Sequence, residues 1–392
     1  MSGRAARARR LAMVCYPSLG GSGVVATELA LGLARRGHEV HVLTSGRLKR
    51  PLPECENLSL HEAHAPDYPL FEQPPHMLAL ASAIARLCQE RAIDVLHVHY
   101  AVPHAASAYL ARQLLGPRAP RLVTTLHGTD VTRVGVDPAY HALTRFCVES
   151  SDAISVPSAY LREAALTQLG IAQAHAVDVI PNCVDTERFA PPARRDPRHF
   201  DALFPAAESG ALTLMHVSNF RAIKRSVELI DVLARARRLL PVRLVLVGDG
   251  PERAACQAHA AELGLSNATC FLGALSSFHE HLQHADGFLL TSDNESFGLA
   301  ALEALSCGVP VFGYRVGGLP SVVTEDSGRL VAPLDRDALA RVLCEVLRDP
   351  QLSAALGRAA RARAVASFRL QPCLEQHERL YERVCAAPAD PP

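Results

Sequence analysis

The feature that most constrains the fold is a regular alternation of short apolar runs with longer segments of helical period. RLAMVCYP (10–17) reads as a strand, and VATELALGLARRGH (25–38) reads as a helix that Gly37 closes. After a break the alternation restarts with TLMHVSN (213–219), and the chain reads as helical from Asp335 onward. A series of this kind is typical of a mostly parallel sheet covered by helices on both faces. We therefore predict an α/β protein with two doubly wound domains.

The break between the two series indicates a change of domain. From Thr186 to Gly210 the chain carries prolines and charges without a clear period, which is typical of an interdomain linker. A chain of 392 residues is also too long for one ordinary core. We expect a first domain of residues 1–186 and a second of residues 187–367, with a ligand cleft between them at the carboxyl ends of the strands. Residues 49–75 read as a proline-studded loop.

Charge and composition exclude several classes of function. The chain has 40 Lys and Arg residues in total and 40 Asp and Glu residues, so its formal net charge at pH 7 is zero. No overall positive potential therefore attracts nucleic acid or an anionic membrane. No apolar run of about 18 residues predicts a membrane span. The basic start MSGRAARARR precedes an apolar run that is too short for a secretory signal. Eleven scattered cysteines without a Cys-x-x-Cys motif indicate reduced thiols in a cytoplasmic protein.

The first helix begins at a glycine-rich turn, GSGVVA (21–26), that fits the G-x-G-x-x-A dinucleotide fingerprint. A nicotinamide enzyme also needs an acidic residue near the end of the second strand for the ribose, but EVHVLTS (39–45) ends in Thr44 and Ser45. A dinucleotide site is therefore the weaker interpretation, and the absence of a following Lys-Ser/Thr excludes a P-loop. Backbone N–H groups at such a turn still favour an anionic group. The alternative is a tight strand-to-helix turn without a ligand.

A second strand-to-helix turn carries two carboxylates eight residues apart, Glu295 and Glu303, in ESFGLAALE. Paired carboxylates suggest a glycosidase, but nothing in the spacing indicates that both flank one scissile bond. The plain alternative makes Glu295 a partner of the helix N-terminus and Glu303 a solvated helix residue.

Three histidines in HVHYAVPHA, at positions 97, 99 and 104, raise the question of a metal site. His97 and His99 share one face of a predicted strand. No nearby cysteine or acidic side chain completes a zinc set, so we expect no metal.

Taken together, these segments resemble those of the retaining glycosyltransferases of family 4, which have the two-domain GT-B fold. Glu295 to Glu303 resembles the Glu-x7-Glu motif of that family, and VGDGP (247–251) resembles its strand-end loop. NFRAIK (219–224) resembles its diphosphate-binding segment, and His127-Gly128 resembles the histidine turn of its first domain. The resemblance covers nearly the whole chain.

The resemblance is narrower in six segments, which include CYPSLGGSGVVATELA (15–30) and VIPNCVD (179–185). They look like members that move N-acetylglucosamine from UDP-GlcNAc to the hydroxyl of L-malate, with retention, in the first step of bacillithiol synthesis. This implies two small-molecule substrates, no metal and no cofactor, and a C-terminal helix (368–392) that crosses back onto the first domain. The alternatives are another acceptor such as an inositol phosphate or a lipid, a UDP-sugar epimerase or hydrolase, and an inactive binding protein. The oligomeric state, including a homo-oligomer, is left open.

The resemblance also implies roles for individual residues. Those implied in catalysis are His127, Arg221, Lys224 and Glu295. Those implied in donor binding are Gly21, Ser296, Phe297, Gly298, Leu299 and Glu303. Those implied in acceptor binding are Ser22, Gly23, Tyr100, Thr129, Arg145 and Asn182. In this scheme the two cations neutralise the departing diphosphate, Glu303 accepts hydrogen bonds from the ribose diol, and Glu295 and His127 hold the sugar.

Overall fold

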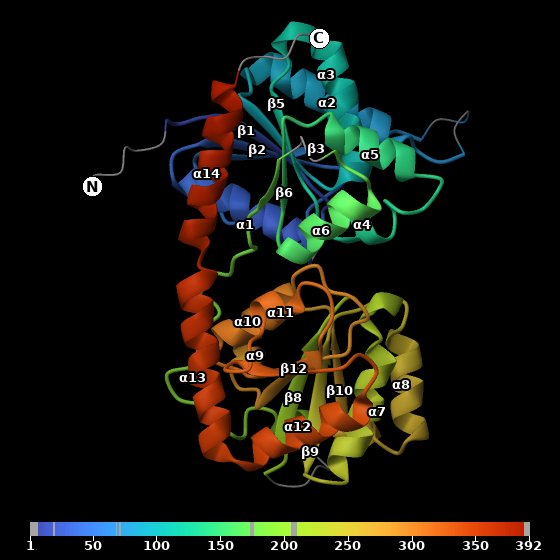
Figure 1. The fold of residues 1–392 in the computed structure, drawn as a ribbon, viewed down its shortest axis with the longest axis vertical. Coiled ribbons are helices and arrows are strands. Elements are labelled where there is room, and N and C mark those ends of the chain that lie inside the picture. The colour runs from blue at the N-terminus through green and yellow to red at the C-terminus, as the bar shows by residue number, and fades with distance from the viewer. Residues whose placement is uncertain are drawn as a thin grey trace. The chain divides into compact units, whose positions relative to one another are not determined.

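The computed structural model describes residues 7–18, 20–67, 69, 72–172, 176–204 and 210–387. The chain forms two compact units, one of Met1–Asn182 with Leu370–Pro392 and one of Cys183–Arg369 (Figure 1). These boundaries differ by a few residues from the expected ones. The reason is that Val184 is bridged to Arg369, and its N–H donates to the carbonyl oxygen of Phe368 at 2.9 Å. Parts of three predicted segments, the basic start, the linker and the C-terminal helix, lie outside the described residues.

The sheet of the first unit has seven parallel strands in the order β3-β2-β1-β4-β5-β6-β7. They are β1 (Arg10–Val14), β2 (Glu39–Thr44), β3 (Leu58–Glu62), β4 (Val95–His99), β5 (Arg121–Thr125), β6 (Ala153–Val156) and β7 (Val177–Val179). Strand β1 pairs with both β2 and β4, so the order reverses at this point, as in a doubly wound sheet. Strands β1, β4 and β5 are almost completely buried, which is why they read as continuous apolar runs.

Helices flank this sheet (Figure 1). They are α1 (Ser22–Arg35), α2 (His76–Arg91), α3 (Ala106–Leu115), α4 (Thr129–Thr132), α5 (His141–Glu149), α6 (Ala159–Gln168) and α14 (Leu370–Ala386), with the short turns η1 (Ala101–Ala105) and η2 (Gly116–Arg118). Helix α14 packs against α1, where the Arg36 guanidinium donates to both carboxylate oxygens of Glu378 at 2.7 Å. The side chain of Leu374 fills the space beside Gly32. The C-terminal helix is therefore anchored to the first helix of the chain.

Two edge strands differ from the sequence-based expectation. Residues 49–75 were expected to form a loop, but β3 lies within them and pairs with β2. Its sequence, LSLHE, is mostly exposed and half polar, so it lacks the apolar run that marks a buried strand. Strand β13 (Gly328–Val331), at the edge of the second sheet, was also not predicted. An edge strand pairs on one side and packs less, so its sequence carries a weaker pattern.

The second unit repeats the arrangement with six parallel strands in the order β10-β9-β8-β11-β12-β13. The remaining strands are β8 (Leu212–Val217), β9 (Val242–Val247), β10 (Thr269–Gly273), β11 (Gly287–Leu290) and β12 (Val311–Tyr314). The helices are α7 (Ser226–Arg237), α8 (Arg253–Glu262), α9 (His279–Leu282), α10 (Leu299–Ser306), α11 (Leu319–Val322), α12 (Arg336–Arg348) and α13 (Pro350–Ser367), with the turns η3 (Asp201–Leu203), η4 (Ala222–Lys224) and η5 (Ser266–Ala268). The two sheets confirm the prediction of two doubly wound α/β domains. Among the described residues, no helix is both long and apolar enough to span a bilayer.

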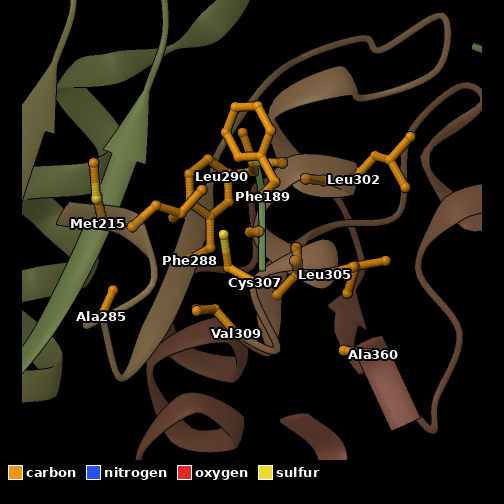
Figure 2. Packing of buried hydrophobic residues seen from close by; sticks show 14 of the residues in the cluster. Phe189, Met215, Ala285, Phe288, Leu290, Leu302, Leu305, Cys307, Val309 and Ala360 are labelled. Atoms are coloured by element: carbon orange, nitrogen blue, oxygen red, sulfur yellow. The ribbon is translucent and has the colours of Figure 1, made fainter. Parts of the chain in front are cut away.

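The core of the second unit fixes the position of α10. Figure 2 shows Leu302 and Leu305 of this helix in one buried cluster with Phe288 and Leu290 of β11. Ala360 of α13 belongs to the same buried cluster. Because α10 packs between the sheet and α13, its first turn is positioned at the end of β11.

Replacement of Phe288 by alanine is expected to lower the free energy of unfolding by about 3–5 kcal/mol, because a completely buried ring is lost and a cavity remains. Urea unfolding followed by circular dichroism measures the change. Leu239→Ala, at a side chain that is 43% exposed, is the matched control and should shift the free energy by less than about 0.5 kcal/mol. A cost below about 1 kcal/mol for Phe288→Ala would show that this cluster does not carry the core.

Candidate functional site

In the second unit, the candidate residues lie in loops at the carboxyl ends of parallel strands. Two glycines after β9 allow these loops to approach closely. A Cβ atom on Gly248 would lie 1.7 Å from the carbonyl oxygen of Ser218, and one on Gly250 would lie 1.9 Å from that of Asn219. Neither position therefore accepts a side chain without displacement of the backbone. The segment that follows β8 and leads to Arg221 and Lys224 is thereby held against the loop after β9.

Lys224 and Glu295 form an ion pair within this unit. The Lys224 ammonium donates to Oε1 of Glu295 at 2.7 Å, and the hydroxyl of Ser292 donates to the same oxygen at 2.7 Å. The Glu295 side chain is 10% exposed and that of Lys224 is 23% exposed. Among the residues that the structure describes, Oε2 of Glu295 has no hydrogen-bond partner. One carboxylate oxygen is thus committed to the protein, and the other remains for a ligand.

The backbone of Glu295 is held by a glycine pair after β12. The N–H of Gly318 donates to the carbonyl oxygen of Glu295 at 2.6 Å. Gly317 has a φ of 52°, and a Cβ atom there would lie 2.1 Å from the same oxygen. Ser292 and this glycine pair were missed from the sequence. The contact of these residues with Glu295 depends on the fold and cannot be read from the sequence. The only sequence signal was the Val-Gly-Gly that follows β12.

The turn before α10 has the geometry expected of a close-approach site. Gly298 has a φ of 99° and directly precedes Leu299, the first residue of the helix. Phe297 is 2% exposed and its ring contacts that of Phe368, so any contact between Phe297 and a ligand goes through its main chain. Ser296 lies half-buried in the same turn.

The plain alternatives for the two carboxylates are wrong. Glu303 is 8% exposed within α10, so it is not a solvated helix residue. The N-terminus of α10 has no side-chain cap, so Glu295 does not act as one. Arg221 is exposed, with extended backbone before η4, and has no ion-pair partner among the described residues. Lys224, Glu295 and the α10 turn thus belong to one constellation, and Arg221 is three residues from it in sequence.

In the first unit, His127 follows β5 and lies between two other rings. It stacks on Tyr100 with 5.4 Å between centroids and on His99 with 5.2 Å between centroids. Tyr100 has a φ of 93° and forms the start of η1 after β4. Tyr16, which follows β1, meets Tyr100 edge to face at 5.3 Å. The structure thus brings Tyr100 and His127 together at the carboxyl ends of neighbouring strands.

Asp130 holds the His127 turn and was not assigned a role from the sequence. Its carboxylate accepts hydrogen bonds from the N–H groups of Gly128 at 2.8 Å, His127 at 3.0 Å and Ala101 at 3.4 Å. The side chain is completely buried, and burial raises the pKa of Asp130 to about 6. Its signal was the HGTD context itself, in which the aspartate three residues after the histidine can reach back to the turn. Thr129 is the first residue of α4, inside this turn.

The imidazoles of this region are neutral at pH 7. Burial lowers the pKa of His127 to about 3 and that of His104 to about 4, and it lowers the pKa of His97 and His99 well below the usual value. His97 is engaged by the hydroxyls of Tyr381 at 2.7 Å and Thr125 at 2.6 Å. Within the described part of the chain, no group of three or more His, Cys, Asp or Glu side chains has the arrangement of a metal site.

The remaining acceptor candidates differ in how the structure places them. Gly21 (φ 59°) is exposed and directly precedes Ser22, the half-buried first residue of α1. A Cβ atom on Gly23 would lie 2.5 Å from the Ser18 hydroxyl, so the plain interpretation of a tight turn accounts for that glycine. Asn182 ends the first unit, shortly after β7.

Arg145, on α5, is held in an ion pair. Its guanidinium pairs with Glu149, one turn further along α5, at 3.2 Å, and faces Gly170 beyond the end of α6. The end of α6 lies near the Asp130 turn, because a Cβ atom on Gly135 would lie 2.4 Å both from the carbonyl oxygen of Asp130 and from Cδ2 of Leu169, the residue before Gly170. The role of Arg145 in acceptor binding stays a prediction.

Comparison with known proteins identifies the family. Residues 19–188 match the family model described as Glycosyltransferase Family 4, and residues 204–363 match the one described as Glycosyl transferases group 1. The N-acetyl-alpha-D-glucosaminyl L-malate synthase of Bacillus anthracis is 39% identical, over 95% of this chain and 96% of that protein. The D-inositol 3-phosphate glycosyltransferase of Saccharomonospora viridis is 31% identical, over 88% of this chain and 85% of its own.

Solved structures agree on the fold. The sucrose-phosphate synthase of Thermosynechococcus elongatus has a TM-score of 0.81 at 23% identity, over 97% of this chain and 100% of that one. Anabaena HepE in complex with UDP-glucose has a TM-score of 0.79 at 18% identity, over 96% and 100% of the two chains. The GT-B prediction is thereby confirmed. Because the Bacillus anthracis relative matches nearly end to end and the model matches the first half, the chain belongs to glycosyltransferase family 4.

Proposed function

We propose that this glycosyltransferase moves N-acetylglucosamine from UDP-GlcNAc to the hydroxyl of L-malate, with retention at the anomeric carbon. The N-acetylglucosaminyl group and L-malate are those in the name of the 39% identical relative, whose likeness extends over 95% of the chain, and the UDP carrier is what the sequence resemblance implies. The observation of the structure that carries the proposal is the Lys224–Glu295 pair, because it joins a cation after β8 to a largely buried carboxylate after β11. We propose no metal and no cofactor.

The leaving group is a diphosphate, which gains negative charge as the glycosidic bond breaks. Lys224 and Arg221 are proposed to neutralise that charge, since both follow β8 within one short segment. The backbone N–H groups of the turn from Ser296 to Leu299 face the same anion at the start of α10, where the helix dipole adds partial positive charge. These groups stabilise the departing UDP and therefore favour cleavage of its bond to the sugar.

The two carboxylates are proposed to hold the hydroxyls of the donor. Glu303 would accept two hydrogen bonds from the vicinal hydroxyls of the ribose. Glu295 would use its unpartnered Oε2 for the sugar while Lys224 and Ser292 fix Oε1. His127 would meet the sugar at its 6-hydroxyl, and Gly21 would offer its N–H to the diphosphate.

The acceptor is a small dicarboxylate and needs hydrogen-bond donors. Ser22 and Gly23 at the start of α1, Tyr100 and Thr129 beside His127, and Asn182 are proposed to supply them, with Arg145 as the carboxylate fork if its pair with Glu149 opens.

The hydroxyl proton of the acceptor is proposed to pass to an oxygen of the departing diphosphate, on the same face as the leaving group. The neutral His127, with a pKa of about 3, is too weak a base for this step. Glu295 is tied to Lys224, and Asp130 is committed to three N–H groups. A front-face substitution of this kind preserves the anomeric configuration.

The direct test mixes the protein with UDP-GlcNAc and L-malate and measures UDP release, with the anomeric proton coupling of the product read by NMR. An α-linked product is expected. Release without malate would identify a hydrolase instead. Release with an inositol phosphate but not with malate would favour the acceptor class named for the Saccharomonospora viridis relative.

Gly317→Ala is expected to lower the rate of transfer about 100-fold, because a Cβ atom 2.1 Å from the Glu295 carbonyl oxygen must displace Glu295. The measurement is kcat/KM for UDP release. Gly264→Ala is the matched control, since Gly264 also has a positive φ, 68°, but has open space around its Cβ position. Equal losses in the two variants would show that backbone strain, and not displacement of Glu295, causes the effect.

A further inference from the structure

A buried row of imidazoles leads to His127. The rings of His97 and His99 stack at 4.5 Å between centroids, and the ring of His99 stacks on that of His127. Nδ1 of His99 lies 2.9 Å from Nε2 of His127, which is a hydrogen bond between the two rings. His99 has no exposed surface at all. The neighbour that shapes the chemistry of His127 is therefore His99.

Each of these two rings carries a single N–H, because burial keeps both neutral. In their shared hydrogen bond one nitrogen must donate and the other must accept. Two arrangements are available. In the first, His99 Nδ1–H donates, and the proton of His127 is on Nδ1. In the second, His127 Nε2–H donates, and the proton of His99 is on its Nε2.

The other nitrogen of His99 decides between them. Nε2 of His99 is buried and has no hydrogen-bond partner among the residues that the structure describes. The second arrangement would place an N–H on this nitrogen with nothing to accept it, and orphaned buried N–H groups are rare. The first arrangement leaves only an unshared lone pair there. It also leaves His127 Nδ1, which has no partner in the described part of the chain, as an N–H group.

We propose that His99 is a positioning residue that holds His127 in the Nδ1–H tautomer, so that His127 presents a hydrogen-bond donor to its ligand. The tautomer itself does not depend on what the ligand is. Only the identity of the ligand rests on the proposed function. In that function, the Nδ1–H group of His127 would donate to a hydroxyl oxygen of the sugar. Asp130 fixes the backbone of the turn, and His99 fixes the proton of the ring.

The tautomer is measured by ¹⁵N NMR of the ligand-free full chain labelled at histidine, with the His127 signals assigned from their loss in His127→Gln. A pyrrole-type shift at His127 Nδ1 and a pyridine-type shift at Nε2 are expected at pH 7.5. The reverse pattern, or equal population of both forms, would overturn the proposal without any substituted protein.

His99→Phe keeps a ring in the stack and removes the N–H. In this variant the His127 nitrogens should lose the Nδ1–H pattern and move toward the Nε2–H form. His97→Phe is the matched control, because His97 belongs to the same buried stack but bonds Tyr381 and Thr125 rather than His127. An unchanged tautomer in His99→Phe would refute the assignment, as would the same change in both variants.

Activity separates this inference from the function on which its consequence rests. UDP release from UDP-GlcNAc by His99→Phe should fall on the order of tenfold in kcat/KM, which corresponds to the loss of one correctly oriented hydrogen bond. If the tautomer changes and UDP release is unaffected, the role of His99 on the ring stands and the role of His127 in transfer fails.

Discussion

Lys224→Ala should lower the turnover of UDP-GlcNAc by a factor on the order of 10²–10³, the loss expected when one group that stabilises a developing charge is removed. The ammonium is the group that reaches Glu295 at 2.7 Å, and Arg221, three residues earlier, is exposed. The KM for the donor should change less than kcat, since the charge on the diphosphate grows only as the bond breaks. Steady-state measurement of UDP release checks both.

Two further variants separate the possible causes. Lys224→Gln retains a hydrogen-bond donor for Glu295 without the charge, so it should stay as impaired as alanine if charge matters, and recover if Lys224 only orients Glu295. Lys49→Ala changes the other lysine, which is exposed in the first unit, and should leave turnover unchanged. Near-normal turnover by a folded Lys224→Ala protein would contradict the proposed role.

The free energy of unfolding is expected to fall steeply as the pH drops from about 6.5 to about 5. Four histidines of the first unit, the buried His97, His99 and His104 and the half-buried His127, have pKa values lowered by desolvation, to about 4 for His104 and about 3 for His127. The unfolded chain binds protons at these positions near pH 6.5, and the folded chain does not. Stability therefore rises with pH in this window and is lost as the pH falls. Each histidine contributes up to about 1.4 kcal/mol per pH unit, and Asp130, whose pKa is raised to about 6, takes up a proton in the folded state over the same window and offsets one such share, so the slope approaches about 4 kcal/mol per unit.

Urea unfolding at pH 7.5, 6.0 and 5.0 measures this slope. His104→Phe should reduce it by about one histidine's share, roughly 1.4 kcal/mol per pH unit, because it removes one titrating group and keeps a ring beside Tyr16. His64→Ala, at an exposed histidine, should leave it unchanged. A stability that is flat between pH 7.5 and pH 5 would show that these histidines are hydrated or already protonated.

The sequence predicted the two doubly wound sheets because their central strands are buried on both faces and therefore read as apolar runs. It failed at β3, whose exposed LSLHE has no such run. Resemblance pointed to Lys224 and Glu295, and the structure shows these two in contact. The contact could not be derived from the sequence, because it joins two loops 71 residues apart.

The supporting residues were harder to predict than the ones they support. Ser292 and Gly317 matter only because of where the ends of two strands meet, and neither has a distinctive local pattern. Asp130 could have been recognised, since an aspartate three residues after a turn is a common acceptor for backbone N–H groups. The side chain of Phe297, inside the motif, is buried by packing, so its predicted part in donor binding would use only its backbone.

The Lys224–Glu295 pair also gives the enzyme a built-in spectroscopic reporter. Lys224 and Lys49 are the only lysines in the sequence, because nearly all of its 40 Lys and Arg residues are arginine. Reductive methylation with ¹³C-formaldehyde retains the positive charge and would label just these two side chains and the α-amino group. The Lys224 methyl resonance would then report the arrival of a nucleotide diphosphate beside the Lys224–Glu295 pair, with the Lys49 resonance as the internal reference.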